Sequence, residues 1–171
     1  LAPDERGMMP GTLIDGLLSD SACKDMTPEF EEEFLKAMIE TATKADPKAI
    51  NGRLGLAQYQ KLGYLSTDFH ESVSHTLDYA YSDFCISTCA EKLGQEELAQ
   101  TYAQYSKNYQ NLFDSETGYM RARDVDGNFR PDFSPYSWGR DYAECSAIQA
   151  SLGVLHDISG LSQLMGGKEA F

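Results

Sequence analysis

The stretch from about Ser72 to Leu93 constrains the fold of this chain more than any other feature. Its apolar residues do not follow one side of a helix, because Cys89 belongs to one side whereas Tyr79 and Ile86 face elsewhere. A helix that is apolar on most sides is packed on most sides. Gly94 follows directly and is a favourable C-terminal stop. The sequence therefore predicts a long inner helix.

The next stretch, from about Gln95 to Phe113, has a narrower apolar pattern. Two helices joined around Gly94 would form an antiparallel hairpin. An outer helix with one stripe, beside an inner helix that is packed all round, is the arrangement of a double-layered helical toroid. The stripe repeats at spacings of 4, 3, 4 and 3 and consists of Leu98, Tyr102, Tyr105, Tyr109 and Leu112.

Other segments predict shorter helices. Thr27 and Pro28 come before a run of acidic residues, which is the pattern of an N-terminal cap and a first helical turn. The apolar face of that helix is expected to comprise Phe30, Phe34, Ala37, Met38 and Thr41. Further helical segments are predicted over residues 52–63, from Asp141 to Leu155, and from His156 to Leu164 with Asp157 as its cap.

Between residues 114 and 138 the pattern changes from helical to rich in turns. Asp126 and Gly127 form a strong turn signal between short strand-like segments, which predicts a β-hairpin or a long loop. The run from Asp124 to Asn128 resembles the start of a calcium loop but lacks the later ligands, so we interpret it as a turn. The arginines near it are expected to pair with acidic residues; they are Arg121, Arg123 and Arg130.

Composition restricts the classes of ligand. The chain carries 27 acidic and 14 basic residues, a formal net charge of −13. Nucleic acids and anionic membrane surfaces require clustered Lys and Arg, so neither is an expected partner. No stretch approaches the roughly 18 apolar residues of a membrane-spanning helix. The chain begins at Leu1 and ends at Phe171 within a helix-like segment, and we expect one excerpt of a larger domain, truncated at both ends.

Cysteine, histidine and tryptophan residues have ordinary structural interpretations. The cysteines Cys85 and Cys89 share one helical face, but no further metal ligands lie near them in sequence, so burial as small apolar residues is expected. We predict that His70 and His75 are exposed and that Trp138 belongs to the core. Without a family resemblance, the sequence indicates a mostly helical, acidic, single-domain chain.

One segment carries a specific resemblance. Residues 72–86, SVSHTLDYAYSDFCI, resemble the segment SVSxTLEYAYDDWxIA of glycoside hydrolase family 92. Further segments follow in the order of that family, so the resemblance covers nearly the whole chain. They are Met9–Ile14, Gly63–Leu65, Ser106–Asp114, Thr117–Arg121, Asp126–Arg130, Phe133–Pro135, Trp138-Gly139, Asp141–Glu144, His156-Asp157 and Leu164–Phe171.

The resemblance implies an exo-acting, calcium-dependent α-mannosidase that removes terminal mannose from glycans with inversion, of α-1,2 type. It implies a helical catalytic domain that is an (α/α)6 toroid packed against a β-sandwich domain, and a periplasmic or extracellular location. The family segments GNDDxGQ and GNEPxHH, which carry the general base and calcium ligands, do not occur in this chain. The chain alone is therefore expected to be inactive, and to pack in the full-length protein against other parts of both domains.

Two residues match functional positions of the family, and a third is a further candidate. An inverting glycosidase needs one carboxyl group that protonates the leaving oxygen and another that activates water. Glu144 matches the proton donor, for which burial and a raised pKa are expected. Asp25 matches an aspartate that holds hydroxyl groups of the terminal sugar, and His156 is a candidate substrate-binding residue. The family's Gly-Asn and three aromatic positions after Glu144 are replaced over residues 145–152.

Those replacements keep an alternative open. A chain that retained the helical toroid and lost the site would be a non-catalytic carbohydrate-binding or interaction module. Another sugar-active toroid enzyme, such as an epimerase or lyase, is a third possibility, which the ordered family segments disfavour. Paired aspartates in the rest of the protein would separate the first two possibilities.

Overall fold

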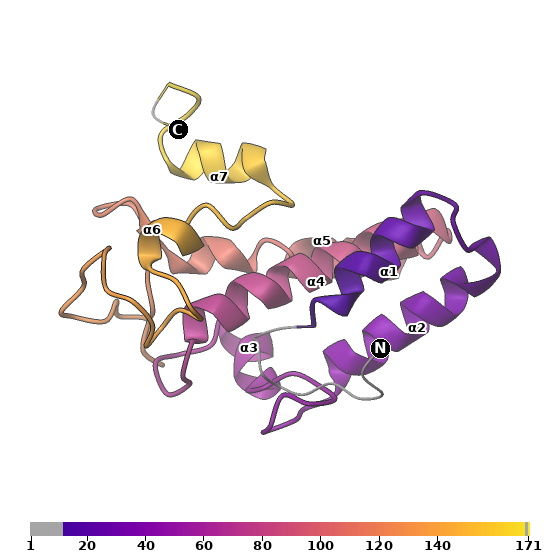
Figure 1. Ribbon diagram of the computed structural model, residues 1–171, viewed down its shortest axis with the longest axis horizontal. Coiled ribbons are helices and arrows are strands. Elements are labelled where there is room, and N and C mark those ends of the chain that lie inside the picture. The colour runs from indigo at the N-terminus through magenta and orange to yellow at the C-terminus, as the bar shows by residue number, and fades with distance from the viewer. Residues whose placement is uncertain (1–11, 170) are drawn as a thin grey trace. The chain divides into compact units, whose positions relative to one another are not determined.

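The computed structural model describes residues 12–169 and Phe171, and the helical class predicted from the sequence is confirmed. The chain forms two compact units (Figure 1). Of the described residues, the first unit comprises 12–57 and 78–107, and the second comprises 58–77, 108–169 and Phe171. The family-like segment at Met9 to Gly11 lies outside the described residues.

The first unit is built from four helical segments around one apolar core. Helix α1 (Ile14–Cys23) is followed by a 3-10 turn (Pro28–Phe30) and helix α2 (Glu31–Thr43). Most of helix α4 (Ser72–Lys92) and all of helix α5 (Glu96–Tyr105) complete the unit. The fully packed core residues are Ala22, Leu35, Met38, Ala42, Cys85, Ile86, Cys89, Ala90, Ala99 and Tyr102.

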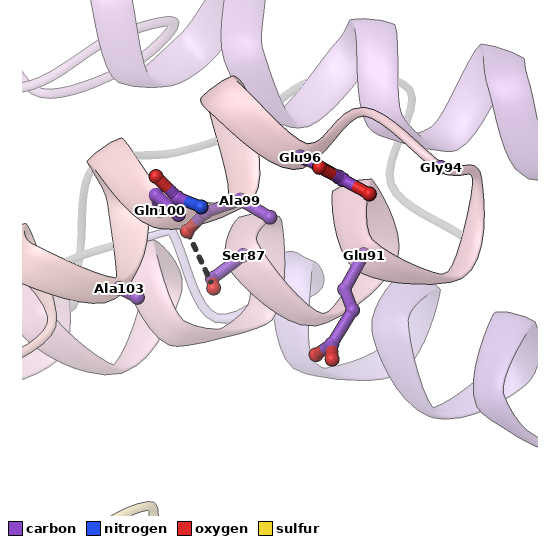
Figure 2. A pocket seen from close by; sticks show the side chains of 7 residues that line it. All are labelled: Ser87, Glu91, Gly94, Glu96, Ala99, Gln100 and Ala103. Atoms are coloured by element: carbon purple, nitrogen blue, oxygen red, sulfur yellow. Dashed lines mark hydrogen bonds between the residues drawn. The ribbon is translucent and has the colours of Figure 1, made fainter.

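The predicted hairpin around Gly94 is confirmed. The Ser87 hydroxyl on α4 donates to the Ala99 carbonyl on α5 over 2.9 Å, as Figure 2 shows. Gly94 has a φ of 71°, a backbone conformation that favours glycine at the end of a helix. Helix α4 is buried on most of its sides, as expected, and Cys85 and Cys89 are buried within it.

Three predictions for helices of this unit are wrong in detail. The buried face of α2 comprises Glu31, Leu35, Met38 and Ala42, so only Met38 of the predicted face is buried. The outer helix ends at Tyr105 instead of near Phe113, and a 3-10 helix over Asn108–Leu112 follows. The Thr27 hydroxyl contacts the Ser21 hydroxyl over 2.9 Å and makes no capping bond.

The second unit combines short helices with a small antiparallel sheet. Helix α3 (Leu56–Leu62) is followed by strands β1 (Phe113–Asp114) and β2 (Tyr119–Met120) and by helices α6 (Ala147–Ala150) and α7 (Ile158–Leu164). The strands pair with Phe113 opposite Met120. The buried residues of this unit include Leu65, Val73, Tyr109, Leu112, Met120, Ala122, Tyr142, Ala147, Val154 and Leu161.

The turn predicted at Asp126-Gly127 is confirmed. The Asp124 carboxylate accepts the backbone N–H groups of Asp126 and Asn128 at 3.0 and 2.9 Å. An isolated antiparallel bridge between Arg123 and Phe129 closes the turn. The turn at Asp126-Gly127 therefore belongs to a second hairpin, after the one formed by β1 and β2. The sequence did not indicate the turn between β1 and β2.

Three other predictions are wrong. Only residues 147–150 of the helix expected from Asp141 to Leu155 are α-helical. His75 is buried, at 7% exposure, because it faces the packed side of α4, whereas His70 is exposed as expected. Trp138, expected in the core, is 68% exposed. None of the helices among the described residues is both long and apolar enough to span a membrane.

Candidate active site

Glu144 lies in a loop that leads from Gly139 into helix α6. Its side chain is exposed, and its backbone has a φ of 49°, in the left-handed region. A residue with a Cβ pays a steric cost in that region, so surrounding contacts must hold it there. The loop that carries Glu144, residues 139–146, is called the Glu144 loop below.

Backbone hydrogen bonds fix both ends of the Glu144 loop. The Gly139 N–H donates to the Cys145 carbonyl over 3.0 Å, which closes the loop on itself. On its far side Ser146 begins α6 with a capping box, in which the Ser146 N–H donates to the Gln149 side chain over 3.0 Å. The two residues after Glu144 are therefore held, Cys145 by Gly139 and Ser146 by Gln149.

The start of helix α4 holds the middle of the same loop. The Val73 N–H donates to the Asp141 carbonyl over 3.0 Å, and the Ala143 N–H donates to the Ser74 hydroxyl over 2.9 Å. The first bond uses one of the amides that a helix N-terminus leaves without an intrahelical partner. The residue directly before Glu144 is therefore anchored to the first turn of α4.

Side chains add two further anchors. The buried Tyr142 hydroxyl donates to the Met120 carbonyl of β2 over 2.7 Å. The Asp141 carboxylate pairs with the Arg130 guanidinium at 3.1 Å. The fold thereby presents Glu144 on a loop that is held from α4, from the sheet and from α6.

The Glu144 carboxylate itself has no hydrogen bond or ion pair with any described residue. It is also exposed, so the burial expected of a proton donor is not supplied by the part of the chain that the structure describes. The site geometry provides an available carboxyl group on an ordered loop. It can exchange a proton with a ligand placed against it.

Asp25 has a partner in the protein. It follows α1 in the first unit, with a φ of 52°, and its carboxylate pairs with the Lys92 ammonium at 2.5 Å. Lys92 also pairs with Glu31 at 2.7 Å and donates to the Ala22 carbonyl. Asp25 therefore takes part in a charged cluster that joins the ends of α1 and α4 to the start of α2.

His156 precedes helix α7 in the second unit and is half-buried. Its ring packs edge-to-face on Tyr109, with centroids 5.6 Å apart. Asp157, the predicted cap, accepts the Gly160 N–H at 3.0 Å and the Tyr109 hydroxyl at 2.7 Å. Asp157 is confirmed as a cap, and the contacts seen for His156 hold it against Tyr109 at the start of α7.

The whole chain, residues 1–171, matches the family described as glycosyl hydrolase family 92 catalytic domain. The chain belongs to glycosyl hydrolase family 92. The family that the ordered segments indicated is thus confirmed, and the chain is part of its catalytic domain.

Solved structures of family 92 proteins share this fold. A family 92 inverting mannosidase from Bacteroides thetaiotaomicron superposes with a TM-score of 0.91 at 38% identity, over 99% of this chain and 23% of that one. A family 92 α-mannosidase from the same organism gives 0.85 at 33% identity, over 93% of this chain and 21% of that one. That second chain has also been solved in complex with mannoimidazole.

A protein from Arthroderma benhamiae described as an uncharacterized secreted glycosidase is 27% identical over 94% of this chain. The chain spans only 25% of that relative and similarly small shares of the two mannosidases. The chain therefore corresponds to about a quarter of the length of these relatives.

The family 92 chain also contains two carboxyl groups that the sequence did not single out, the buried Asp15 and the half-buried Asp78. Burial raises the pKa of Asp78 on α4 to about 7 and that of Asp15 at the start of α1 to about 6. The Thr12 hydroxyl, which donates to Asp15 over 2.7 Å, opposes that rise. The only sequence signal for Asp78 is a charged residue among apolar neighbours on the inner helix.

A buried ion pair lies in the same unit. The Arg53 guanidinium and the Asp83 carboxylate are 2.8 Å apart, and both side chains are almost fully buried. Arg53 also lies over the Tyr79 ring, 4.9 Å from its centroid. These contacts join the loop before α3 to the middle of α4.

A hollow of the first unit lies elsewhere. Figure 2 shows it over the α4–α5 hairpin, lined by small and acidic residues and containing none of the three predicted site residues. Nor do the described residues include any group of three or more His, Cys, Asp or Glu placed to hold a metal ion. The lining residues of the hollow are Ser87, Glu91, Gly94, Glu96, Ala99, Gln100 and Ala103.

Proposed function

We propose that this chain is part of the catalytic domain of an exo-acting α-mannosidase, which hydrolyses terminal mannose from glycans with inversion and prefers α-1,2 linkages. The observation that carries the proposal is the 0.91 TM-score, at 38% identity and over 99% of this chain, to a family 92 inverting mannosidase. Since the chain spans 23% of that protein, the activity belongs to the full-length protein. The 171-residue chain alone is inactive under this proposal.

Glu144 is the proposed proton donor to the leaving oxygen. Bonds to α4, to β2 and to α6 hold its loop, while its carboxyl group has no partner among the described residues. A proton donor needs such a fixed direction toward the leaving oxygen. The water-activating carboxylate would lie roughly 6.5–9.5 Å away across the sugar and would come from another part of the protein.

Other parts of the full-length protein would also cover Glu144. The second unit exposes several large apolar side chains, among them Tyr136 at 79%, Trp138 at 68% and Leu155 at 72%. Exposed apolar side chains of this size mark surfaces that pack against something else. We propose that they pack against the rest of the catalytic domain, within an (α/α)6 toroid, and against its β-sandwich partner.

Asp25 and His156 stay proposed substrate-binding residues with weaker support. One oxygen of the Asp25 carboxylate binds Lys92, and the other oxygen can accept a hydrogen bond from a sugar hydroxyl. His156 is held by its ring contact with Tyr109, which orients an imidazole for hydrogen bonding. Sugar hydroxyls suit both groups, because carboxylates and neutral imidazoles can accept hydrogen bonds from them.

Calcium dependence and a periplasmic or extracellular location are further parts of the proposal. The described residues do not form a set of oxygen ligands that fits Ca²⁺, so its ligands would come from other parts of the protein. Loss of activity of the full-length protein on calcium chelation would test this. The location is supported by the relative described as secreted.

A non-catalytic carbohydrate-binding module is the second candidate. It is favoured by the exposure of Glu144 and by the side chains that follow it, Ile148, Ala150 and Leu152, where the family segment carries aromatic residues. Aromatic faces raise the pKa of a neighbouring acid and stack on sugars, so their absence weakens the site.

Glu144→Gln in the full-length protein separates the two candidates. The amide keeps the shape of the side chain and cannot donate an acidic proton, so hydrolysis of an α-1,2-linked mannobiose should fall by roughly 10²- to 10⁴-fold, as for other general acids. Glu116→Gln, on the exposed turn between β1 and β2, is the matched control and should keep full activity. Equal turnover by wild type and Glu144→Gln would remove Glu144 from this role.

A further inference from the structure

Among the described residues, Ser74 is the one side chain of another element that bonds to the backbone directly next to Glu144. Its hydroxyl accepts the Ala143 N–H over 2.9 Å, and Ala143 directly precedes Glu144. Ser74 lies in the first turn of α4, a helix that is buried on most sides and is therefore a rigid support. The Ser74 hydroxyl thus connects a rigid helix to the residue directly before Glu144.

The other anchors of the Glu144 loop hold residues before Ala143 or after Glu144. The bonds from Glu71 to Arg140, at 2.9 Å, and from Val73 to Asp141, at 3.0 Å, join backbone atoms and hold the loop before Ala143. A side-chain substitution at Ser74 leaves both in place. Loss of the Ser74 hydroxyl would therefore free the backbone directly before Glu144, while Asp141 stays attached to α4 and Cys145 to Gly139.

The backbone of Glu144 makes this local bond important. A φ of 49° is unfavourable for a residue with a Cβ, and such a conformation persists only where neighbouring contacts hold it. With the Ala143 bond removed, rotation of the backbone to a common conformation would turn the Glu144 side chain in another direction. Misplacement of a catalytic group by about 1 Å can cost roughly 100-fold in rate.

From this geometry we propose that Ser74 is a positioning residue that sets the direction of Glu144, an inference that rests on Glu144 being the proton donor. Ser74 does not transfer a proton. It holds the Ala143 amide, and through it the backbone of Glu144, so that the carboxyl group meets the leaving oxygen.

The test uses substrates that differ in their need for a proton. An α-mannoside of a sugar has a poor leaving group and depends on the general acid, whereas a dinitrophenyl α-mannoside departs as a stable anion and hardly depends on it. In the full-length protein, Ser74→Ala should lower kcat for α-1,2-mannobiose by roughly 10-fold and kcat for the dinitrophenyl substrate by less than about 2-fold. KM should change little.

Two further variants control for loss of structure. Ser72 lies in the same helical turn, is fully buried, and its hydroxyl has no hydrogen bond with the described residues, so Ser72→Ala should match wild type with both substrates. Ser74→Thr keeps a hydroxyl and should recover most of the activity on mannobiose. Equal losses on both substrates for Ser74→Ala would indicate a general structural defect and would overturn the inference.

Glu144→Gln, measured beside these variants, tells the two proposals apart. If Glu144→Gln loses mannobiose hydrolysis and Ser74→Ala does not, Ser74 has no positioning role and the proposed function stands. If Glu144→Gln retains wild-type activity on mannobiose, Glu144 is not the acid and both proposals are contradicted. A selective loss on mannobiose in both variants supports both.

Discussion

At the scale of single residues, Asp78 is a carboxyl group that the fold holds away from water. Burial raises its pKa from 3.8 to about 7. Because the folded pKa lies above that of the unfolded chain, the folded state binds more protons between about pH 4 and pH 7. The free energy of unfolding therefore falls as pH rises through that window, by up to about 1.4 kcal/mol per pH unit for one group.

Asp78→Asn should remove this contribution. The variant cannot ionise, so its melting temperature should decline less than that of wild type between pH 5 and about pH 7.5. Calorimetry of the full-length proteins at both pH values measures the difference. Asp68→Asn replaces an exposed carboxyl group in the second unit and should follow wild type. Parallel pH profiles of Asp78→Asn and wild type would contradict the expected role of Asp78.

The sequence indicated Glu144 as a site residue and predicted its burial, but it indicated neither its exposure nor the contacts that hold its loop. The family-like segment indicated Glu144, whereas its left-handed backbone and its anchor on Ser74 depend on residues far apart in the chain. Asp25 shows the same limit, because its partner Lys92 is 67 residues away. A local pattern specifies residue types, and long-range contacts decide what each side chain meets.

At the scale of elements, helix α7 depends on one capping side chain. Asp157 accepts both the Gly160 N–H of the helix and the hydroxyl of buried Tyr109. Burial raises the pKa of Tyr109 to about 12, so the phenol is protonated and donates. Asp157→Ala removes a cap and leaves a buried donor without its acceptor, and should lower the stability of α7 by about 2–4 kcal/mol.

Hydrogen exchange in the full-length protein measures this effect. The amides of α7 should exchange faster in Asp157→Ala as local opening becomes easier. Asp157→Asn keeps one oxygen acceptor for the Gly160 N–H, and its NH2 group can donate to the Tyr109 hydroxyl oxygen, so α7 should lose less protection than in Asp157→Ala. Unchanged protection of α7 in Asp157→Ala would show that the helix is held by other contacts.

The helices were predictable where the apolar pattern is continuous. Helix α4 follows from its pattern and from Gly94, and the structure has it within one residue of the expected end. On α2 the buried face includes Glu31, whose burial depends on Lys92, so the pattern of apolar residues placed the face incorrectly. The Asp141 carbonyl accepts the Val73 N–H and the Ala143 N–H donates to the Ser74 hydroxyl, so these backbone groups bond to the start of α4 instead of forming a helix.

At the scale of the whole molecule, this chain is a piece of a larger catalytic domain. The relatives are about four times its length, and both units expose large apolar side chains such as Leu17 and Trp138. The fold of the piece is specified by its own core residues, while the proposed function needs groups that this chain does not contain. Activity is therefore a property to be measured on the full-length protein.

The most direct measurement follows the product of hydrolysis by proton NMR. The full-length protein is incubated with α-1,2-mannobiose, and the anomeric signals of the released mannose are recorded before mutarotation. We expect β-mannose to appear first, since inversion converts an α-linkage to a β-product, and the purified 171-residue chain to release none. Absence of hydrolysis by the full-length protein, or α-mannose as the first product, would contradict an inverting α-mannosidase.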